Sequence, residues 1–340
     1  MLGSLAIPIV GAPMGGGAST PALAAAISDA GGLGFLAAGY KTPEAMSADI
    51  AATRALTAAP IGINVFAVTP TEADPAAIEA FRTRLGEGAG EPRSDDDAFD
   101  AKVERLLAEP VAVVSFTFGC PVATLIERLR AGGGGRARLG DVADRDPDLA
   151  AGADALIVQG FEAGGHRAAF VDDAPGDIGL LALLQLVAAA VPGLPLVATG
   201  GIATGRAVAA VLAAGAAAAQ VGTAFMRCPE AATPEVHREA LARPGRTAVT
   251  RAFTGRSGRG IVNAFMREHE AAAPHAYPAV HYVTAPLRAR AREQRDADTL
   301  HLWAGQAHEL IRDVPAAELV RALHAEARAA AAETQSRLDR

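Results

Sequence analysis

The chain has 340 residues, half of them hydrophobic, and a formal net charge of -7. This length allows one large domain with an appendage, or two domains. The negative charge argues against the basic face that nucleic-acid binding requires. Cys120 and Cys228 provide neither a disulfide framework nor metal-ligand spacing. The N-terminus lacks a basic signal-peptide region, and the apolar run 180–191 is too short to span a bilayer. We therefore expect a cytoplasmic protein with no nucleic-acid or membrane partner.

Short apolar runs alternate with alanine-rich helical segments over the first two thirds of the chain. Thr20-Pro21 and Thr42-Pro43 are typical helix starts, with a threonine cap followed by proline at the first helical position. Such alternation predicts β-α units around a parallel sheet that is buried on both faces. The expected strands lie at 7–13, 32–38, 61–68, 111–119, 155–160, 194–201 and 217–223.

An eighth strand is needed to close a barrel, and the gap falls within 132–150. The segment 136–142 is the candidate for this fifth strand in chain order. The acidic, turn-rich segment 69–104 is either a lid or a solvated surface loop that carries a helix. After about residue 226 the alternation stops, and helices are expected at 234–243, twice within 277–313, and within 315–340. The predicted fold is an α/β protein: a (β/α)8 TIM barrel over 1–226, with an α-helical extension over 227–340 that packs on the barrel mouth.

Two glycine-containing loops follow neighbouring strands at the edge where such folds carry their sites. Gly200, Gly201 and Thr204 precede a helix, whose free N–H groups and dipole favour an anion. The next strand ends in QVGTAF, which contains Gly222. The two loops together predict a phosphate site; the alternative is that the glycines serve only tight turns. Because GxGxxG and GxxxxGK[ST] motifs are absent from strand ends, and GRSGRG (255–260) follows no buried strand, the phosphate would belong to a cofactor such as FMN or to a substrate.

The segment EAGGHR places His166 directly after a buried strand and a Gly-Gly pair. Glycines allow a flat ligand to approach the backbone, and imidazole titrates near neutral pH, so His166 is a candidate general base. A structural role is the alternative. Glu162 and Arg167 are interpreted as a solvated ion pair; the alternative is that they orient or polarise the site. The other seven histidines show no metal-ligand spacing, and no metal site is predicted.

Several motifs together resemble the nitronate monooxygenase family, formerly called 2-nitropropane dioxygenases. They are GAPM, STPALAAAISDAGGLGFLAAGY, GINVF, VSFTFG, ALIVQGFEAGGHR, LPLVATGGIATGR and AQVGTAF. Members are FMN-dependent (β/α)8 barrels. The resemblance extends from about residue 5 to 315, because GRSGRGIVNAF, YPAVHYVTAPLRA and LWAGQA also resemble that family. The motifs are less specific for the reaction, since FMN-dependent enoyl-acyl-carrier-protein reductases share these loops.

The resemblance implies that His166 is the catalytic base beside the flavin. Trp303 and Gln306, one helical turn apart, would fold over the flavin, or Trp303 would merely anchor a helix. Met14, Phe66, Phe116 and Phe118 are either pocket walls or core residues. The implied and predicted cofactor-binding residues are Ala12, Pro13, Met14, Asn64, Gln159, Gly164, Gly165, Gly200, Gly201, Gln220, Val221, Gly222, Thr223 and Gln306.

Two features depart from the family pattern. Gly11 stands where the family often has glutamine, which removes a polar group near the flavin. The segment 132–150 does not match the usual fifth strand and helix, which leaves one pocket wall undefined.

Three functions follow, with a small-molecule nitronate and O2 as the expected partners of the first. The first is FMN-dependent oxidation of alkyl nitronates, and of nitroalkanes after proton removal, to a carbonyl compound and nitrite. The second is reduction of enoyl thioesters or quinones with NAD(P)H. The third is a flavin- or phosphate-binding barrel without catalysis. The oligomeric state, monomer or homodimer, is not determined by the sequence.

Overall fold

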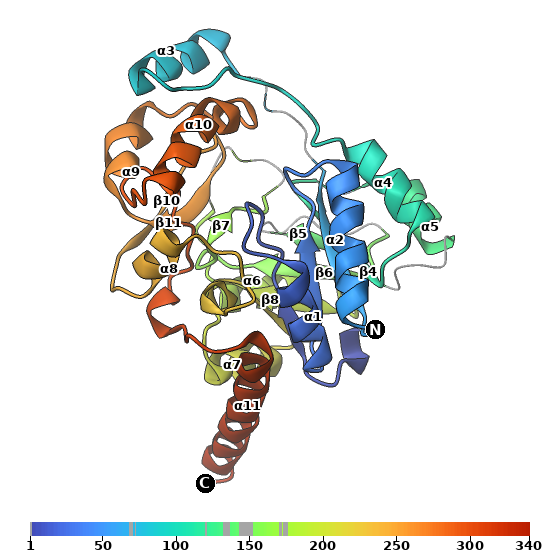
Figure 1. The fold of residues 1–340 in the computed structure, drawn as a ribbon. Coiled ribbons are helices and arrows are strands. Elements are labelled where there is room, and N and C mark those ends of the chain that lie inside the picture. The colour runs from blue at the N-terminus through green and yellow to red at the C-terminus, as the bar shows by residue number, and fades with distance from the viewer. Residues whose placement is uncertain are drawn as a thin grey trace.

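Eight parallel strands form the central sheet of the computed structural model (Figure 1), which describes residues 2–67, 71, 73–119, 121–131, 137–142, 152–169, 172 and 176–340. The strand order is β1-β9-β8-β6-β5-β4-β3-β2, and every pair is parallel. The predicted eighth strand is confirmed as β5, in the expected segment. The strands are β1 (Ile9–Gly11), β2 (Gly34–Ala37), β3 (Ile61–Phe66), β4 (Val113–Thr117), β5 (Ala137–Val142), β6 (Ala155–Gln159), β8 (Leu196–Thr199) and β9 (Ala218–Val221).

The two outermost strands of this order also approach each other. Val10 of β1 makes an isolated parallel bridge with Leu33, the residue before β2. The Gly11 N–H donates to the Leu33 carbonyl, and the Leu33 N–H donates to the Ile9 carbonyl. Buried side chains from strands across the whole order pack in one cluster, which includes Val10, Phe35, Val113, Ile157, Val197 and Ala218.

Two of the helices between the strands, α1 and α2, begin where the threonine–proline signals predict. The Thr20 hydroxyl accepts from the Leu23 N–H, and the Thr42 hydroxyl accepts from the Ala45 N–H. Gly34 is required by the close packing of α1 on β2, because a Cβ there would lie 2.0 Å from the Ala24 carbonyl oxygen. The helices between the strands include α1 (Pro21–Asp29), α2 (Pro43–Leu56), α4 (Phe99–Ala108), α5 (Ala123–Ala131), α6 (Leu180–Ala190) and α7 (Gly205–Ala213).

The segment 69–104 carries α3 (Pro75–Leu85) and the start of α4, and its residues 69, 70 and 72 lie outside the described chain. In Figure 1, α3 lies beside α10 (Ala279–Glu293), far from the sheet that precedes it. Phe81 of α3 is buried with Val280 of α10, and the Gly90 N–H donates to the Val283 carbonyl. The excursion therefore packs on the C-terminal part of the chain.

The extension after residue 226 is not wholly helical, and the prediction was wrong on this point. Strands β10 (Thr247–Thr250) and β11 (Gly258–Ile261) form an antiparallel pair, and β11 also pairs with β7 (Gly165–His166). Each missed strand has only four residues, and in β11 glycine and arginine interrupt any apolar alternation. Of the two helices predicted within 277–313, one is α10; the other is only a 3-10 turn at His308–Leu310. The remaining helices are α8 (Glu235–Leu241), α9 (Ala264–His269) and α11 (Ala316–Leu338).

Helix α11 packs against α7 through its first half, and its C-terminal end projects from the body (Figure 1). Its Glu326 carboxylate accepts from the Gly205 N–H at the start of α7. Cys228 is a buried free thiol, whereas Cys120 lies outside the described residues. Within the described part of the chain, every helix is too short or too polar to cross a bilayer.

Candidate functional site

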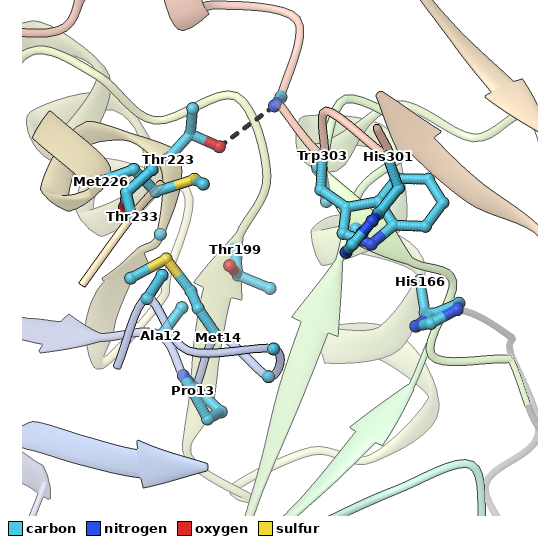
Figure 2. A pocket seen from close by; sticks show the side chains of 18 of the residues that line it. Ala12, Pro13, Met14, His166, Thr199, Thr223, Met226, Thr233, His301 and Trp303 are labelled. Carbon is cyan, nitrogen blue, oxygen red and sulfur yellow. Dashed lines mark hydrogen bonds between the residues drawn. The ribbon is translucent and has the colours of Figure 1, made fainter. Parts of the chain in front are cut away.

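A cavity of about 260 Å³ opens at the carboxyl ends of the parallel strands (Figure 2). Loops that follow β1, β2, β8 and β9 form one side, and the C-terminal part of the chain covers the other. Most of the predicted cofactor residues line it: Ala12, Pro13, Met14, Asn64, Gln159, Gly164, Gly165, Gly200, Gly201, Gln220, Gly222 and Thr223, together with His166.

Two predicted residues do not line the cavity. Val221 is buried in the core, because the neighbouring Gln220 takes the cavity side of β9. Gln306 is exposed, and the predicted helix around it is absent: Trp303 instead makes an isolated antiparallel bridge with Gly260. Trp303 itself lines the cavity.

The remaining apolar wall candidates separate into two groups. Met14, Phe66 and Phe118 line the cavity, whereas Phe116 is a core residue. A Cβ at Gly11 would lie 2.6 Å from the Ile27 Cδ1 atom of α1. A side chain at position 11 would therefore point at α1, and its absence takes nothing from the cavity wall. Of the segment 132–150, which was expected to form the undefined wall, residues 132–136 and 143–150 lie outside the described residues.

The glycine loops at one end of the cavity present unpaired backbone donors. Gly200 has φ +121° and Gly201 has φ +67°, conformations that favour glycine. In the described chain, the N–H groups of Gly201 and Gly222 have no protein acceptor. The Thr223 hydroxyl accepts from the Gly305 N–H at 3.1 Å, so its own proton remains available (Figure 2). This end of the cavity suits an anion such as a phosphate.

Three amide side chains extend from strands β3, β6 and β9: Asn64 and Gln220 are buried, and Gln159 is partly buried. Asn64 donates to the Ser115 and Thr117 hydroxyls at 2.8 and 2.9 Å. Gln159 donates to the His166 carbonyl and accepts from the Ala168 N–H, so it holds the loop that carries the histidine.

Gln220 is different, because its Oε1 atom is buried without a hydrogen-bond partner in the described chain. A buried, unpaired acceptor is costly unless a ligand supplies the donor. The Gln220 amide therefore indicates that the cavity is built for a polar ligand.

The position of His166 is fixed by strand pairing and by a close backbone contact. His166 pairs with Gly258 of β11. A Cβ at Gly164 would lie 2.5 Å from the Ala304 carbonyl carbon, so only glycine permits this approach. Arg167 is buried and donates to the Gly160 carbonyl, while Glu162 accepts from the Leu180 N–H at the start of α6. The solvated ion pair predicted for Glu162 and Arg167 was therefore wrong.

The contacts of the His166 ring define its tautomer. Its Nε2 atom lies 2.9 Å from the Thr254 Oγ1 atom, and Oγ1 also lies 3.1 Å from the Arg256 carbonyl. Because a carbonyl only accepts, the single Thr254 hydroxyl proton goes to Arg256, and His166 Nε2–H donates to Thr254. Nδ1 then carries the lone pair and has no partner in the described chain.

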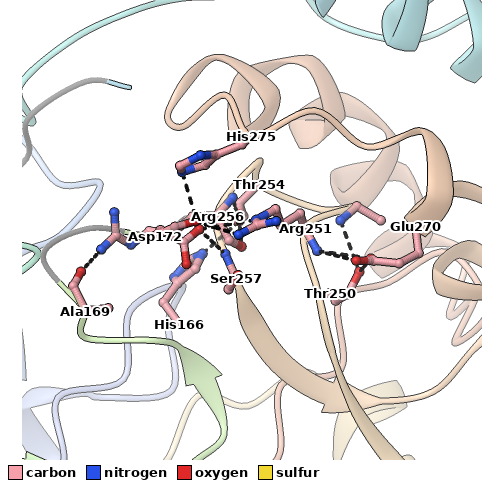
Figure 3. A network of polar contacts seen from close by, with 11 residues as sticks. His166, Ala169, Asp172, Thr250, Arg251, Thr254, Arg256, Ser257, Glu270 and His275 are labelled. Atoms are coloured by element: carbon pink, nitrogen blue, oxygen red, sulfur yellow. Dashed lines mark hydrogen bonds and ion pairs between the residues drawn. The ribbon is translucent and has the colours of Figure 1, made fainter. Parts of the chain in front are cut away.

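A polar network behind this contact holds the turn in place (Figure 3). The buried Asp172 carboxylate accepts from the Ser257 N–H at 2.8 Å and lies 3.4 Å from Arg251 Nε. Glu270 accepts from the Arg251 N–H. Thr254 is thus held rigidly against His166.

The protonation state of His166 is set by its surroundings. Burial, followed by the nearby Arg256 and Arg288 guanidinium groups, lowers the pKa of His166 from 6.5 to about 3. The rings of Phe118, Tyr277 and Trp303 surround it at centroid distances of 5.5 to 5.8 Å. The imidazole is therefore neutral at pH 7.

Sequence reasoning missed a second group of cavity residues: Tyr40, which follows β2, and His281, Arg288 and Arg292 of α10. The Tyr277 hydroxyl donates to the Tyr40 hydroxyl at 3.1 Å, and the Tyr40 ring stacks on His281 at 4.1 Å. Arg288 follows His281 by seven residues on the same helix face. The spacing of His281, Arg288 and Arg292 within YPAVHYVTAPLRARAR was the available signal.

The charges on the cavity wall have one sign. Arg288, Arg292 and five histidines line it, whereas its lining includes neither aspartate nor glutamate. In the part of the chain that the structure describes, no group of histidine, cysteine and carboxylate side chains is arranged to hold a metal ion. This cationic lining suits an anionic ligand.

Comparison with known proteins identifies the family. The nitronate monooxygenase family model matches residues 2–326. The chain belongs to the nitronate monooxygenase family. It is 42% identical to a nitronate monooxygenase from Pseudomonas aeruginosa, over 94% of this chain and 96% of that protein. It is 40% identical to one from Paraburkholderia phytofirmans, over 94% and 92% of the two chains.

Solved structures agree with this assignment. The structure of a nitroalkane oxidase from Streptomyces ansochromogenes has a TM-score of 0.92 and 47% identity, covering 97% of this chain and 98% of that one. The structure of FabK from Thermotoga maritima has a TM-score of 0.79 and 28% identity, covering 98% and 97%. The protein is thus an oxidoreductase of the nitronate monooxygenase family.

Proposed function

We propose that this protein oxidises alkyl nitronates with O2 to a carbonyl compound and nitrite, using FMN held in the cavity. The observation that carries the proposal is the combination of family membership with a cavity whose wall holds neutral His166 and no carboxylate. The eight strands would form a closed barrel through the Val10–Leu33 bridge and the shared cluster of buried strand residues.

The residues present fit FMN. The N–H groups of Gly201 and Gly222 and the Thr223 hydroxyl would hold its phosphate, and Gln220 Oε1 would accept from the polar edge of the ring. Gly164 and Gly165 leave the backbone accessible to a flat ring. FMN, when bound, would take electrons from the nitronate and pass them to O2.

His166 would act on a neutral nitroalkane by taking the α-proton at Nδ1. The lowered pKa makes His166 a weak base, because each pKa unit of the shift disfavours the protonated imidazole by about 1.4 kcal/mol. A preformed nitronate needs no such transfer. Nitronates are therefore expected to be much better substrates than the corresponding nitroalkanes.

The test is O2 uptake and nitrite release by the flavin-loaded protein with an alkyl nitronate and no NAD(P)H. Rapid uptake with nitrite formation supports the proposal. Absence of uptake, together with rapid anaerobic flavin reduction by NAD(P)H, would support a reductase instead. Flavin retention without either reaction would indicate a binding protein.

The pH dependence follows from the His166 environment. The pKa of His166 is about 3 in the folded protein, against an ordinary value of 6.5 in the unfolded chain. His166 in the folded protein therefore stays neutral as the pH falls through 6.5. We expect kcat/KM for a nitroalkane, divided by that for its nitronate, to show no inflection near pH 6.5. Steady-state rates from pH 5.5 to 8 test this, and a fall in this ratio as the pH drops through 6.5 would contradict it.

The free energy of unfolding should decline as the pH falls below 6.5, because His166 binds a proton in the unfolded chain but not in the folded chain.

Replacing Thr254 with valine removes the acceptor that fixes the His166 tautomer. The kcat/KM for the nitroalkane should fall by about 10-fold, as expected for loss of one hydrogen bond that orients a base, with the nitronate affected less. Thr254→Ser retains the hydroxyl and should keep kcat/KM for the nitroalkane, relative to that for the nitronate, at the parent value. Equal losses for both substrates in the valine variant would indicate a purely structural role for Thr254.

A further inference from the structure

Arg288 is a buried cation without a carboxylate partner. Its side chain is 8% exposed, and no aspartate or glutamate of the described chain lies within ion-pair distance. Burying an unpaired charge is costly, so such a group is retained where a ligand supplies the counter-charge. Arg288 lines the cavity.

The donors of Arg288 are only partly used within the protein. Nε donates to the Thr284 hydroxyl at 3.0 Å, and Nη2 donates to the His281 carbonyl at 2.8 Å. Thr284 in turn donates to the Phe253 carbonyl. These bonds fix the plane of the guanidinium and leave Nη1 without a partner in the described chain.

His281 supplies a second donor beside Arg288. Its Nδ1 atom lies 3.2 Å from Arg288 Nη2, and a guanidinium only donates, so Nδ1 accepts. Neutral His281 therefore carries its proton on Nε2. The ring also stacks on Tyr40, which fixes its orientation on the cavity wall.

We propose that Arg288, through Nη1 and with His281 Nε2–H beside it, binds the negative charge of the substrate and determines specificity for nitronates over neutral nitroalkanes. The proposal rests on the proposed function. A nitronate spreads one negative charge over two oxygens of a planar group. A fixed guanidinium matches such a group better than a flexible ammonium does.

Nitrate, a planar monoanion that does not react, is the probe for this site. Isothermal titration of the flavin-loaded protein should give about 10- to 100-fold weaker nitrate binding in Arg288→Gln, the range expected for one lost charge-assisted hydrogen bond. Arg288→Lys keeps the charge but not the planar donors, and should be intermediate. Arg295→Gln is the matched control: Arg295 follows the same helix, pairs with exposed Glu239, and lies outside the cavity lining. It should bind nitrate like the parent protein.

The kinetic readout is the ratio of kcat/KM for an alkyl nitronate to that for its nitroalkane. Arg288→Gln should lower this ratio at least 10-fold with FMN content unchanged. Unchanged nitrate affinity in folded Arg288→Gln would overturn the proposal. The proposal would also be overturned if Arg288→Gln lost FMN but still bound nitrate like the parent protein. If Arg288→Gln does not fold, unchanged nitrate affinity in Arg288→Lys would overturn it. Arg288-dependent nitrate binding without any nitronate oxidation would support the anion site and overturn the proposed function alone.

Discussion

Replacing His166 with glutamine is expected to lower kcat/KM for a neutral nitroalkane by about 10²- to 10⁴-fold, the usual contribution of a positioned general base. Oxidation of the preformed nitronate should stay within about 10-fold of the parent rate, because no proton is removed from carbon. Glutamine is close in size to histidine and can still donate to Thr254. The measurement is O2 uptake with each substrate at saturating oxygen.

A matched control is His324→Gln on α11, outside the cavity lining, which should leave both rates unchanged. Flavin absorbance measures whether the His166→Gln variant still holds FMN, which it is expected to do. Equal losses with nitroalkane and nitronate would show that His166 acts on a step common to both, and the assignment as base would be wrong.

The parallel sheet was predictable because its signals are local. Each strand is a short apolar run, and Thr20 and Thr42 begin their helices with the cap bonds that the sequence indicates. Even β5, in a glycine-rich segment, was detectable because the β-α count required it. Strands β10 and β11 were not, because each is only four residues long and β11 also pairs with β7, more than 80 residues earlier in the chain.

The same distinction applies to the cavity. Residues at the ends of the parallel strands were predicted because a parallel sheet places those ends together. Tyr40, His281 and Arg288 were missed because only the fold brings α10 beside Tyr40, where the Tyr40 ring stacks on His281. The spacing of His281 and Arg288 marks one helix face but does not specify what that face contacts. Gln306 was misplaced for a related reason: the pairing of Trp303 with Gly260 replaces the helix that spacing alone predicted.

A buried ion pair beneath Tyr40 gives the second large expected effect. Lys102 is fully buried, and its Nζ atom lies 2.6 Å from Asp97 Oδ2 and 3.0 Å from the Ala38 carbonyl. Asp97→Ala would leave this ammonium without its counter-charge. The free energy of unfolding is expected to fall by about 3–5 kcal/mol, the usual result of removing one partner of a buried pair. Urea denaturation measures this directly.

The double variant Asp97→Ala/Lys102→Met separates charge burial from site geometry. Removing both charges should recover most of the lost unfolding free energy, since an apolar replacement of a buried pair is often near neutral. Asp97 Oδ1 also accepts from the Tyr40 N–H at 2.9 Å, where Tyr40 has φ +65°. That bond stays lost in the double variant, so nitrate should still bind about fivefold more weakly, the effect of about 1 kcal/mol from one hydrogen bond. Full recovery of both stability and nitrate affinity would show that Asp97 serves only as a counter-charge, and that the segment before α4 does not position the Tyr40–His281 wall.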